Sequence, residues 1–240
     1  MKYTYEQLAK SIDHALLGPT LTTADLGQGI QLALTYDVAS VCIMPYFLRE
    51  CADRLAGSTV KTSTTIGFPH GNQSTGMKVA EAEQAIADGC QELDMVVNIS
   101  KVLSGDWDYV HKEVRVLIEL THAAGQWMKV IFENCYLNDE QKIQLCQICS
   151  ELNADWIKTS TGFGSGGATA DDLKLMQEHT AEHVQIKAAG GIRDLETLIA
   201  MRQLGATRCG ASNTKEILDA ARLELNMPAI SLSSSGKTSY

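Results

Sequence analysis

The chain has 240 residues, of which 45% are hydrophobic, and a formal net charge of −9. This length and hydrophobic content suffice for one large domain or two small ones with a sizeable core. The negative charge argues against general binding to nucleic acid or to a membrane surface, but it allows a local basic pocket. No apolar stretch approaches the roughly 18 residues that a membrane-spanning helix needs, and the N-terminus has no signal-peptide pattern. We therefore expect a cytoplasmic protein without nucleic-acid or membrane partners.

Short β-prone runs alternate along the chain with longer segments of helical apolar spacing. The runs predict strands at 12–16, 40–44, 61–66, 92–98, 128–132, 156–159, 184–188 and 207–211. The intervening segments predict helices at 22–36, 46–55, 77–87, 109–122, 140–152, 171–180, 195–204 and 215–225. This alternation favours a single α/β domain, a closed (β/α)8 TIM barrel at 1–230, over an open doubly wound sheet. The serine-rich stretch 231–240 predicts a short flexible tail.

The seven cysteines predict reduced core thiols, because their number is odd and most lie in apolar surroundings. Cys146 and Cys149 form a CxxC motif, but the motif lies in a helical pattern without a second pair. We expect neither redox nor zinc chemistry there. The six histidines are dispersed, so we expect no metal site.

Polar residues gather at the predicted carboxyl ends of strands, where barrels of this kind place their catalytic groups. The set comprises Asp13, Asp94, Lys129, Glu133, Lys158 and Lys187. Each residue alone is compatible with a structural role: Lys158 with a strand-end lysine whose ammonium reaches water, and Asp94 with a buried salt bridge that does no chemistry.

Lys158 and Lys187 lie on neighbouring predicted strands, which are about 4.8 Å apart. Repulsion between two ammonium groups and their burial both favour the neutral form of one amine. A pKa near 7–8 instead of 10.4 corresponds to about 3–4 kcal/mol. The neutral amine would be a nucleophile toward a carbonyl group, and Asp94 would pair with the charged lysine and relay a proton.

Three glycine-bearing segments follow the last three predicted strands, at 162–167, 190–193 and 210–213. Late loops of barrels commonly hold a phosphate through backbone N–H groups and a helix N-terminus. These loops predict a phosphorylated carbonyl substrate. With Asp13 on the first strand, the predicted substrate- and phosphate-binding residues are Asp13, Gly162, Gly190, Gly191, Arg193, Gly210 and Ser212.

These residues lie in motifs through which the chain resembles the deoxyribose-phosphate aldolases, class I aldolases with a TIM-barrel fold. The resemblance covers nearly the whole chain, and its motifs lie at 12–14, 40–43, 65–72, 92–96, 128–131, 157–162, 187–193 and 210–212. The lysine motifs Lys-Thr-Ser-Thr-Gly at 158–162 and Lys-x-x-Gly-Gly at 187–191 are the most specific.

The resemblance implies reversible cleavage of 2-deoxy-D-ribose 5-phosphate to acetaldehyde and D-glyceraldehyde 3-phosphate, a step of deoxyribonucleotide catabolism. Lys158 would form the Schiff base, Lys187 would lower its pKa and Asp94 would relay protons. Some members end in a tyrosine that assists proton transfer, which implies that role for Tyr240. No metal or organic cofactor is implied, the partners are a sugar phosphate and aldehydes, and a homodimer is the family-level expectation.

Four positions depart from the family pattern: Ala15 and Asn134 stand where threonine is common, Met44 where asparagine is common, and Asn213 where a serine is common. We therefore expect a looser preference for the 5-phosphate. Cys42 lies near the predicted mouth and is expected to be a core thiol rather than a target of unsaturated aldehydes. Two other functions stay open: a class I aldolase for another sugar phosphate, and a catalytically silent sugar-phosphate-binding barrel.

Overall fold

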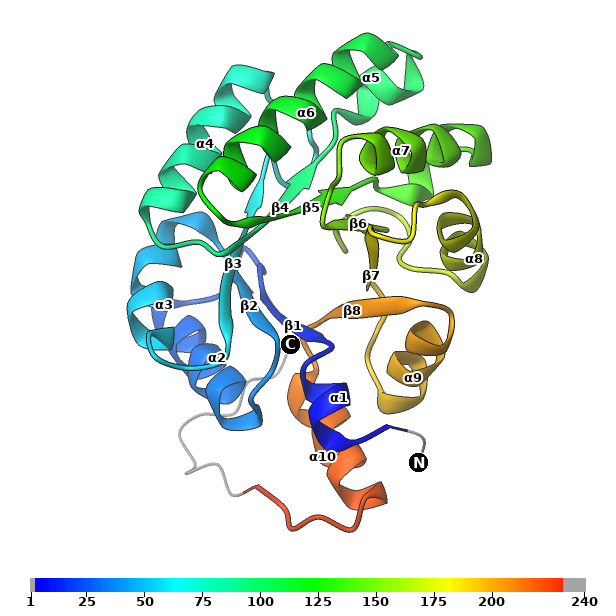
Figure 1. The fold of residues 1–240 in the computed structure, drawn as a ribbon. Coiled ribbons are helices and arrows are strands. Elements are labelled where there is room, and N and C mark those ends of the chain that lie inside the picture. The colour runs from blue at the N-terminus through cyan, green and yellow to red at the C-terminus, as the bar shows by residue number, and fades with distance from the viewer. Residues whose placement is uncertain (1–2, 231–240) are drawn as a thin grey trace.

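The computed structural model describes residues 3–230 and contains a closed barrel of eight parallel strands (Figure 1). Each strand pairs with the next one along the chain, and β8 pairs with β1. The strands are β1 (Ile12–Leu16), β2 (Ser40–Ile43), β3 (Lys61–Ile66), β4 (Glu92–Val96), β5 (Trp127–Ile131), β6 (Trp156–Lys158), β7 (Gln185–Ala189) and β8 (Ala206–Ala211). The predicted (β/α)8 barrel is confirmed.

Helices surround the barrel and connect successive strands (Figure 1). The α-helices are α1 (Tyr5–Ala9), α2 (Thr23–Tyr36), α3 (Leu48–Leu55), α4 (Thr75–Ala87), α5 (Ile99–Leu103), α6 (Trp107–Ala123), α7 (Asp139–Glu151), α8 (Ala170–His179), α9 (Leu195–Gln203) and α10 (Thr214–Glu224). Two 3-10 turns, η1 (Pro45–Phe47) and η2 (Asn134–Tyr136), follow β2 and β5. All eight predicted helices are present, and their ends differ from the predicted ones by a few residues.

The largest differences from the predicted elements have local causes. Helices α1 and α5 were not predicted, because five residues are too few to show a helical repeat. The strand predicted at 92–98 ends at Val96, since the Asn98 side chain caps α5 by accepting a hydrogen bond from Lys101 N. The helix predicted at 46–55 begins instead as the turn η1 at Pro45.

Two kinds of core lie on the two faces of the strands. Along β4, Leu93 and Met95 belong to the hydrophobic cluster between strands and helices, whereas Glu92 and Asp94 alternate with them and face the barrel interior. All four residues are fully buried. The barrel therefore has an ordinary apolar layer outside its strands and a charged interior, and that interior contains Asp94, Lys158 and Lys187.

Within residues 3–230, no helix is both long enough and apolar enough to cross a membrane. The predicted tail at 231–240, including Tyr240, lies outside the described residues.

Candidate active site

Lys158 is the last residue of β6, and its side chain is only 4% exposed. Lys187 lies directly beside it in the register of β6 and β7. The Nζ atoms of both lysines are 2.8 Å from the same atom, Oδ2 of Asp94. The structure thus brings the three predicted catalytic residues of the barrel into direct contact.

Asp94 also contacts a third lysine, Lys129, which in turn pairs with Glu92. Its Oδ1 accepts a hydrogen bond from Lys129 Nζ at 2.9 Å, and Lys129 also pairs with Glu92 Oε2 at 2.6 Å. All of these side chains are fully buried. One carboxylate therefore holds three lysines at fixed positions within the barrel.

Asp13 lies in the same charge cluster. Its Oδ2 is 2.5 Å from Lys187 Nζ, and its Oδ1 is 2.5 Å from Arg208 on β8. Arg208 also pairs with Glu92, with its Nη2 atom 3.0 Å from Glu92 Oε1. Asp13 was predicted among the substrate-binding residues, and the structure places it at the cavity and also as a direct partner of Lys187.

Sequence reasoning gave no role to Glu92 and Arg208, although both complete this cluster. A signal for Glu92 was present, because a residue two positions from Asp94 points to the same face of a strand. Arg208 lies in register with Lys187, just as Lys187 lies in register with Lys158. The three basic residues therefore form one row across β6, β7 and β8.

The balance of charges in the cluster distinguishes Lys158 from the other basic residues. Three carboxylates (Asp13, Glu92 and Asp94) face three cations (Lys129, Lys187 and Arg208), and the formal charges cancel. Lys158 is a fourth basic group, and its ion pair within residues 3–230 is to an oxygen that Lys187 already contacts. A proton on Lys158 would thus add an uncompensated charge to a buried site.

The pKa values follow this balance. Burial lowers the pKa of the Lys158 amine; Asp94 opposes this shift and the Lys187 ammonium adds to it. Burial also favours the neutral form of Lys187, but Asp13 and Asp94 outweigh it and raise the pKa of Lys187. The pKa of Asp94 lies well below its ordinary value because the three lysines outweigh its burial. Lys158 is therefore the lysine of this cluster that gives up its proton more readily, whereas the raised pKa of Lys187 keeps it charged.

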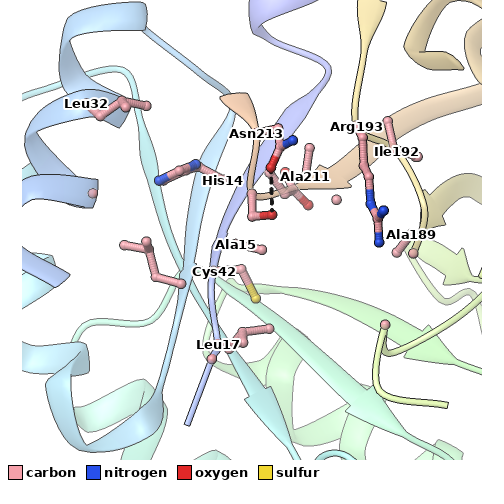
Figure 2. A pocket seen from close by; sticks show the side chains of 18 of the residues that line it. His14, Ala15, Leu17, Leu32, Cys42, Ala189, Ile192, Arg193, Ala211 and Asn213 are labelled. Carbon is pink, nitrogen blue, oxygen red and sulfur yellow. Dashed lines mark hydrogen bonds between the residues drawn. The ribbon is translucent and has the colours of Figure 1, made fainter. Parts of the chain in front are cut away.

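Asp13, Lys158 and Lys187 of this cluster line a cavity of about 960 Å³. Figure 2 shows other residues that line it, among them Ala15 on β1, Cys42 on β2 and Arg193. Burial raises the pKa of the Cys42 thiol. Every predicted substrate- and phosphate-binding residue also lines it: Asp13, Gly162, Gly190, Gly191, Arg193, Gly210 and Ser212. The cavity thus joins the predicted nucleophile to the predicted phosphate loops in one continuous space.

Lys78 shows why access to the cavity matters as well as pKa. Its amine on α4 is fully buried, and burial lowers its pKa despite an ion pair with Glu113 at 2.9 Å. It also donates to Val96 O at 2.7 Å and does not line the cavity. Lys78 has a lowered pKa without access to a substrate, whereas Lys158 has both.

Close packing between the loops after β6 and β7 explains two of the glycines. A Cβ atom on Gly167 would lie 2.3 Å from Gly190 O, so the two backbones can approach only without a side chain there. Gly190 and Gly191 have φ angles of 84° and 83°, in the region that favours glycine. Above these loops, Arg193 and Ser212 are exposed at the cavity, and Ser212 Oγ lies 3.4 Å from Asn213 Oδ1 (Figure 2).

Glu133 supports the loop after β6 from below. It accepts hydrogen bonds from Thr161 N, at 3.2 Å, and from the Thr161 hydroxyl. Of the four positions that depart from the family pattern, two line the cavity, Ala15 and Asn213. The other two do not: Met44 packs against the hydrophobic core, and Asn134 is buried.

Within the described residues, no group of three or more His, Cys, Asp or Glu side chains is arranged to hold a metal ion. Cys146 and Cys149 are buried in α7, and burial raises the pKa of both thiols, that of Cys146 to about 11.

Comparisons with known proteins agree with this geometry. A family model described as DeoC/LacD family aldolase matches residues 8–218. The deoxyribose-phosphate aldolase of Rhodopirellula baltica is 64% identical over 238 residues, 99% of each chain. That of Thermococcus gammatolerans is 42% identical over 217 residues, covering 90% of this chain and 96% of that one. The tetrameric deoxyribose phosphate aldolase structure from Aeropyrum pernix superposes with a TM-score of 0.85 at 27% identity, covering 91% and 92% of the two chains.

Proposed function

Because the chain belongs to the DeoC/LacD family of aldolases, we propose that it reversibly cleaves 2-deoxy-D-ribose 5-phosphate into acetaldehyde and D-glyceraldehyde 3-phosphate. The observation that carries this proposal is the buried Lys158, which lines a cavity with phosphate-type loops and whose pKa is lowered by burial. A silent binding barrel would have no use for a buried lysine with a lowered pKa, so catalysis explains this feature better.

In the proposed reaction, the Lys158 amine attacks C1 of the open-chain sugar, and loss of water leaves a protonated imine. Removal of the proton from the C3 hydroxyl then lets the C2–C3 bond break. Its electron pair moves toward the imine nitrogen and forms an enamine, while C3 becomes the aldehyde carbon of glyceraldehyde 3-phosphate. Protonation of C2 and addition of water release acetaldehyde and restore the amine. The imine is the electron sink, so these steps need no other cofactor.

Asp94 and Lys187 would manage the protons of these steps. Asp94 Oδ2 is 2.8 Å from both lysine nitrogens, which gives a short route between the reacting amine and a charged ammonium. Asp13 and Asp94 keep Lys187 protonated, so it is a standing proton donor beside the imine.

The loops after β6, β7 and β8 would hold the 5-phosphate. Their glycines let a phosphate approach the backbone N–H groups closely, and Arg193 and Ser212 add side-chain donors at the same end of the cavity. The substrate would then stretch from Lys158 to these loops.

Borohydride trapping with acetaldehyde tests the nucleophile. We expect one adduct, on Lys158, and a trapping rate that rises with pH through the pKa of Lys158 and levels off above it, because only the free amine attacks. The midpoint should lie below the ordinary lysine value of 10.5. Lys187→Met removes a neighbouring ammonium and leaves Asp94 less compensated, so the midpoint should move to higher pH. Mass spectrometry of the trapped protein at a series of pH values measures both.

Lys78 is an internal control, because its pKa is also lowered but it does not reach the cavity. An adduct on Lys78 instead of Lys158, or no adduct on folded protein, would contradict the proposed chemistry. Lys174→Met, which changes a lysine whose side chain is 64% exposed, should leave the midpoint where it is.

We further propose a looser preference for the 5-phosphate than the family pattern implies, because Ala15 and Asn213 line the cavity where hydroxyl groups are common in relatives. The ratio of kcat/KM for deoxyribose 5-phosphate to that for deoxyribose should fall short of several thousand. Asn213→Ser should raise this ratio by about tenfold, since a hydrogen bond to a charged group contributes roughly 1.5–3 kcal/mol. Asn138→Ser, at the N-cap of α7 and outside the cavity, is the control.

A role of Tyr240 in proton transfer, a homodimer and a cytoplasmic location remain proposals for this chain. The resemblance implies the role of Tyr240 and the homodimer, whereas the cytoplasmic location is expected from the odd number of cysteines in mostly apolar surroundings.

A further inference from the structure

The cavity above Lys158 lies toward one side of the barrel mouth. Its lining comes from β1, β2, β6, β7 and β8, from the segments that follow β1, β6, β7 and β8, and from α2 and α10. Among residues 3–230, none of its lining comes from β3, β4 or β5 or from the loops that follow those strands. The cavity therefore does not extend to that half of the barrel mouth.

An aromatic pair lies at this boundary. Phe163 follows β6 and lines the cavity, whereas Phe68 follows β3 and does not. Their ring centroids are 5.3 Å apart, with an angle of 85° between the ring planes. The edge of one ring thus meets the face of the other, an arrangement that adds attraction beyond the area it buries. Because β3 and β6 are separated by β4 and β5, the pair bridges the mouth over those two strands.

Phe163 is held in place although 48% of its surface is exposed. Its backbone N donates to the Thr161 hydroxyl at 3.0 Å, and that hydroxyl in turn donates to the buried carboxylate of Glu133. The next residue, Gly164, leaves no room for a Cβ atom, which would lie 2.8 Å from Cys135 Sγ. Phe68 is held from the other side, because Gly67 N donates to Glu81 at 2.7 Å. Both rings therefore stand on fixed backbone.

We propose that Phe163, backed by Phe68, is the wall that limits the size of the acceptor aldehyde in this active site. The inference rests on the proposed aldolase function, in which the donor carbons are bonded to Lys158 and the acceptor fills the space beside them. Phe163 lies in the glycine-bearing loop after β6, and with Phe68 it bounds that space toward β3, β4 and β5. The rings offer no hydrogen bond to an acceptor, so the wall acts through shape.

Selectivity between acceptors tests the wall. With acetaldehyde as donor, kcat/KM is measured for propanal and for the bulkier phenylacetaldehyde. In Phe163→Ala, the ratio of phenylacetaldehyde to propanal should rise by about tenfold or more, the scale on which pocket size discriminates between substrates. Phe68→Ala should change the ratio in the same direction, since it removes the backing ring. Tyr136→Ala, at an aromatic residue that is 47% exposed and lies outside the cavity, should leave it unchanged.

The ratio of the two kcat/KM values distinguishes rings that limit the size of the acceptor from rings that only stabilise their loops. If both Phe163→Ala and Phe68→Ala lower the two rates equally, the rings only stabilise their loops and the inference is wrong. Should either alanine variant fail to fold, the leucine variant at the same position is measured, and an unchanged ratio there overturns the inference as well. Trapping of wild-type Lys158 with acetaldehyde is run in parallel: a failed trap contradicts the proposed function, whereas a successful trap with unchanged ratios contradicts only the wall.

Discussion

Lys158→Met is expected to lower kcat by about 10⁴–10⁶-fold, the scale on which an enzyme loses activity when its nucleophile is removed. The same variant should fold with at least the stability of the unmodified protein. The remaining three carboxylates and three cations of the cluster still balance, and a methionine fills the volume of a lysine stem without a polar group to bury. Turnover of deoxyribose 5-phosphate and the free energy of unfolding in urea measure the two effects.

This combination of results is specific to a lysine that is neutral in the folded protein. If Lys158 instead carried a structural charge, its removal would take away one of the three lysines that contact Asp94 and would lower the free energy of unfolding. Lys174→Met should change neither quantity, because that side chain is exposed at the surface. A stable Lys158→Met protein with near-normal turnover would refute the assignment of the nucleophile.

The parts of the site that the sequence predicted are those set by strand order and by the alternation of residues along a strand. Lys158 and Lys187 end up side by side because consecutive parallel strands are neighbours in a barrel. Asp94 reaches them because its side of β4 faces the interior, where the strands curve toward one another. The glycine loops follow from the position of late strands in such barrels.

Other features depend on distances that no local pattern contains. Arg208 compensates Asp13 on the neighbouring strand β1 and Glu92 across the barrel on β4, and only the closed geometry decides which carboxylate pairs with which cation. The contact between Phe68 and Phe163 joins loops that are 95 positions apart, and neither loop alone predicts it. Asp13 was expected near the substrate, but its ion pair with Lys187 became visible only when the strands closed.

Asp94→Asn tests the centre of this cluster. The substitution removes one of three buried carboxylates and leaves Lys129, Lys187 and Arg208 as three cations facing two anions. In addition, the side-chain amide of the variant carries an NH2 group, which is a donor. This group would face the ammonium of one of the lysines that contact Oδ1 or Oδ2 in the unmodified protein. We expect a loss of about 3–5 kcal/mol in the free energy of unfolding, the usual cost of removing one member of a buried ion pair. Turnover should also fall, because the proton route between Lys158 and Lys187 is lost.

Glu113→Gln distinguishes the loss of stability from the loss of turnover. Glu113 forms an equally buried ion pair with Lys78, but this pair joins α6 to α4 outside the barrel. The variant should lose a similar amount of stability and keep its kcat at a temperature where it is fully folded. If Asp94→Asn behaves in the same way, Asp94 is only a structural anion. If its kcat falls while the folded fraction stays high, the carboxylate that organises the charges of the barrel also takes part in the proton transfers.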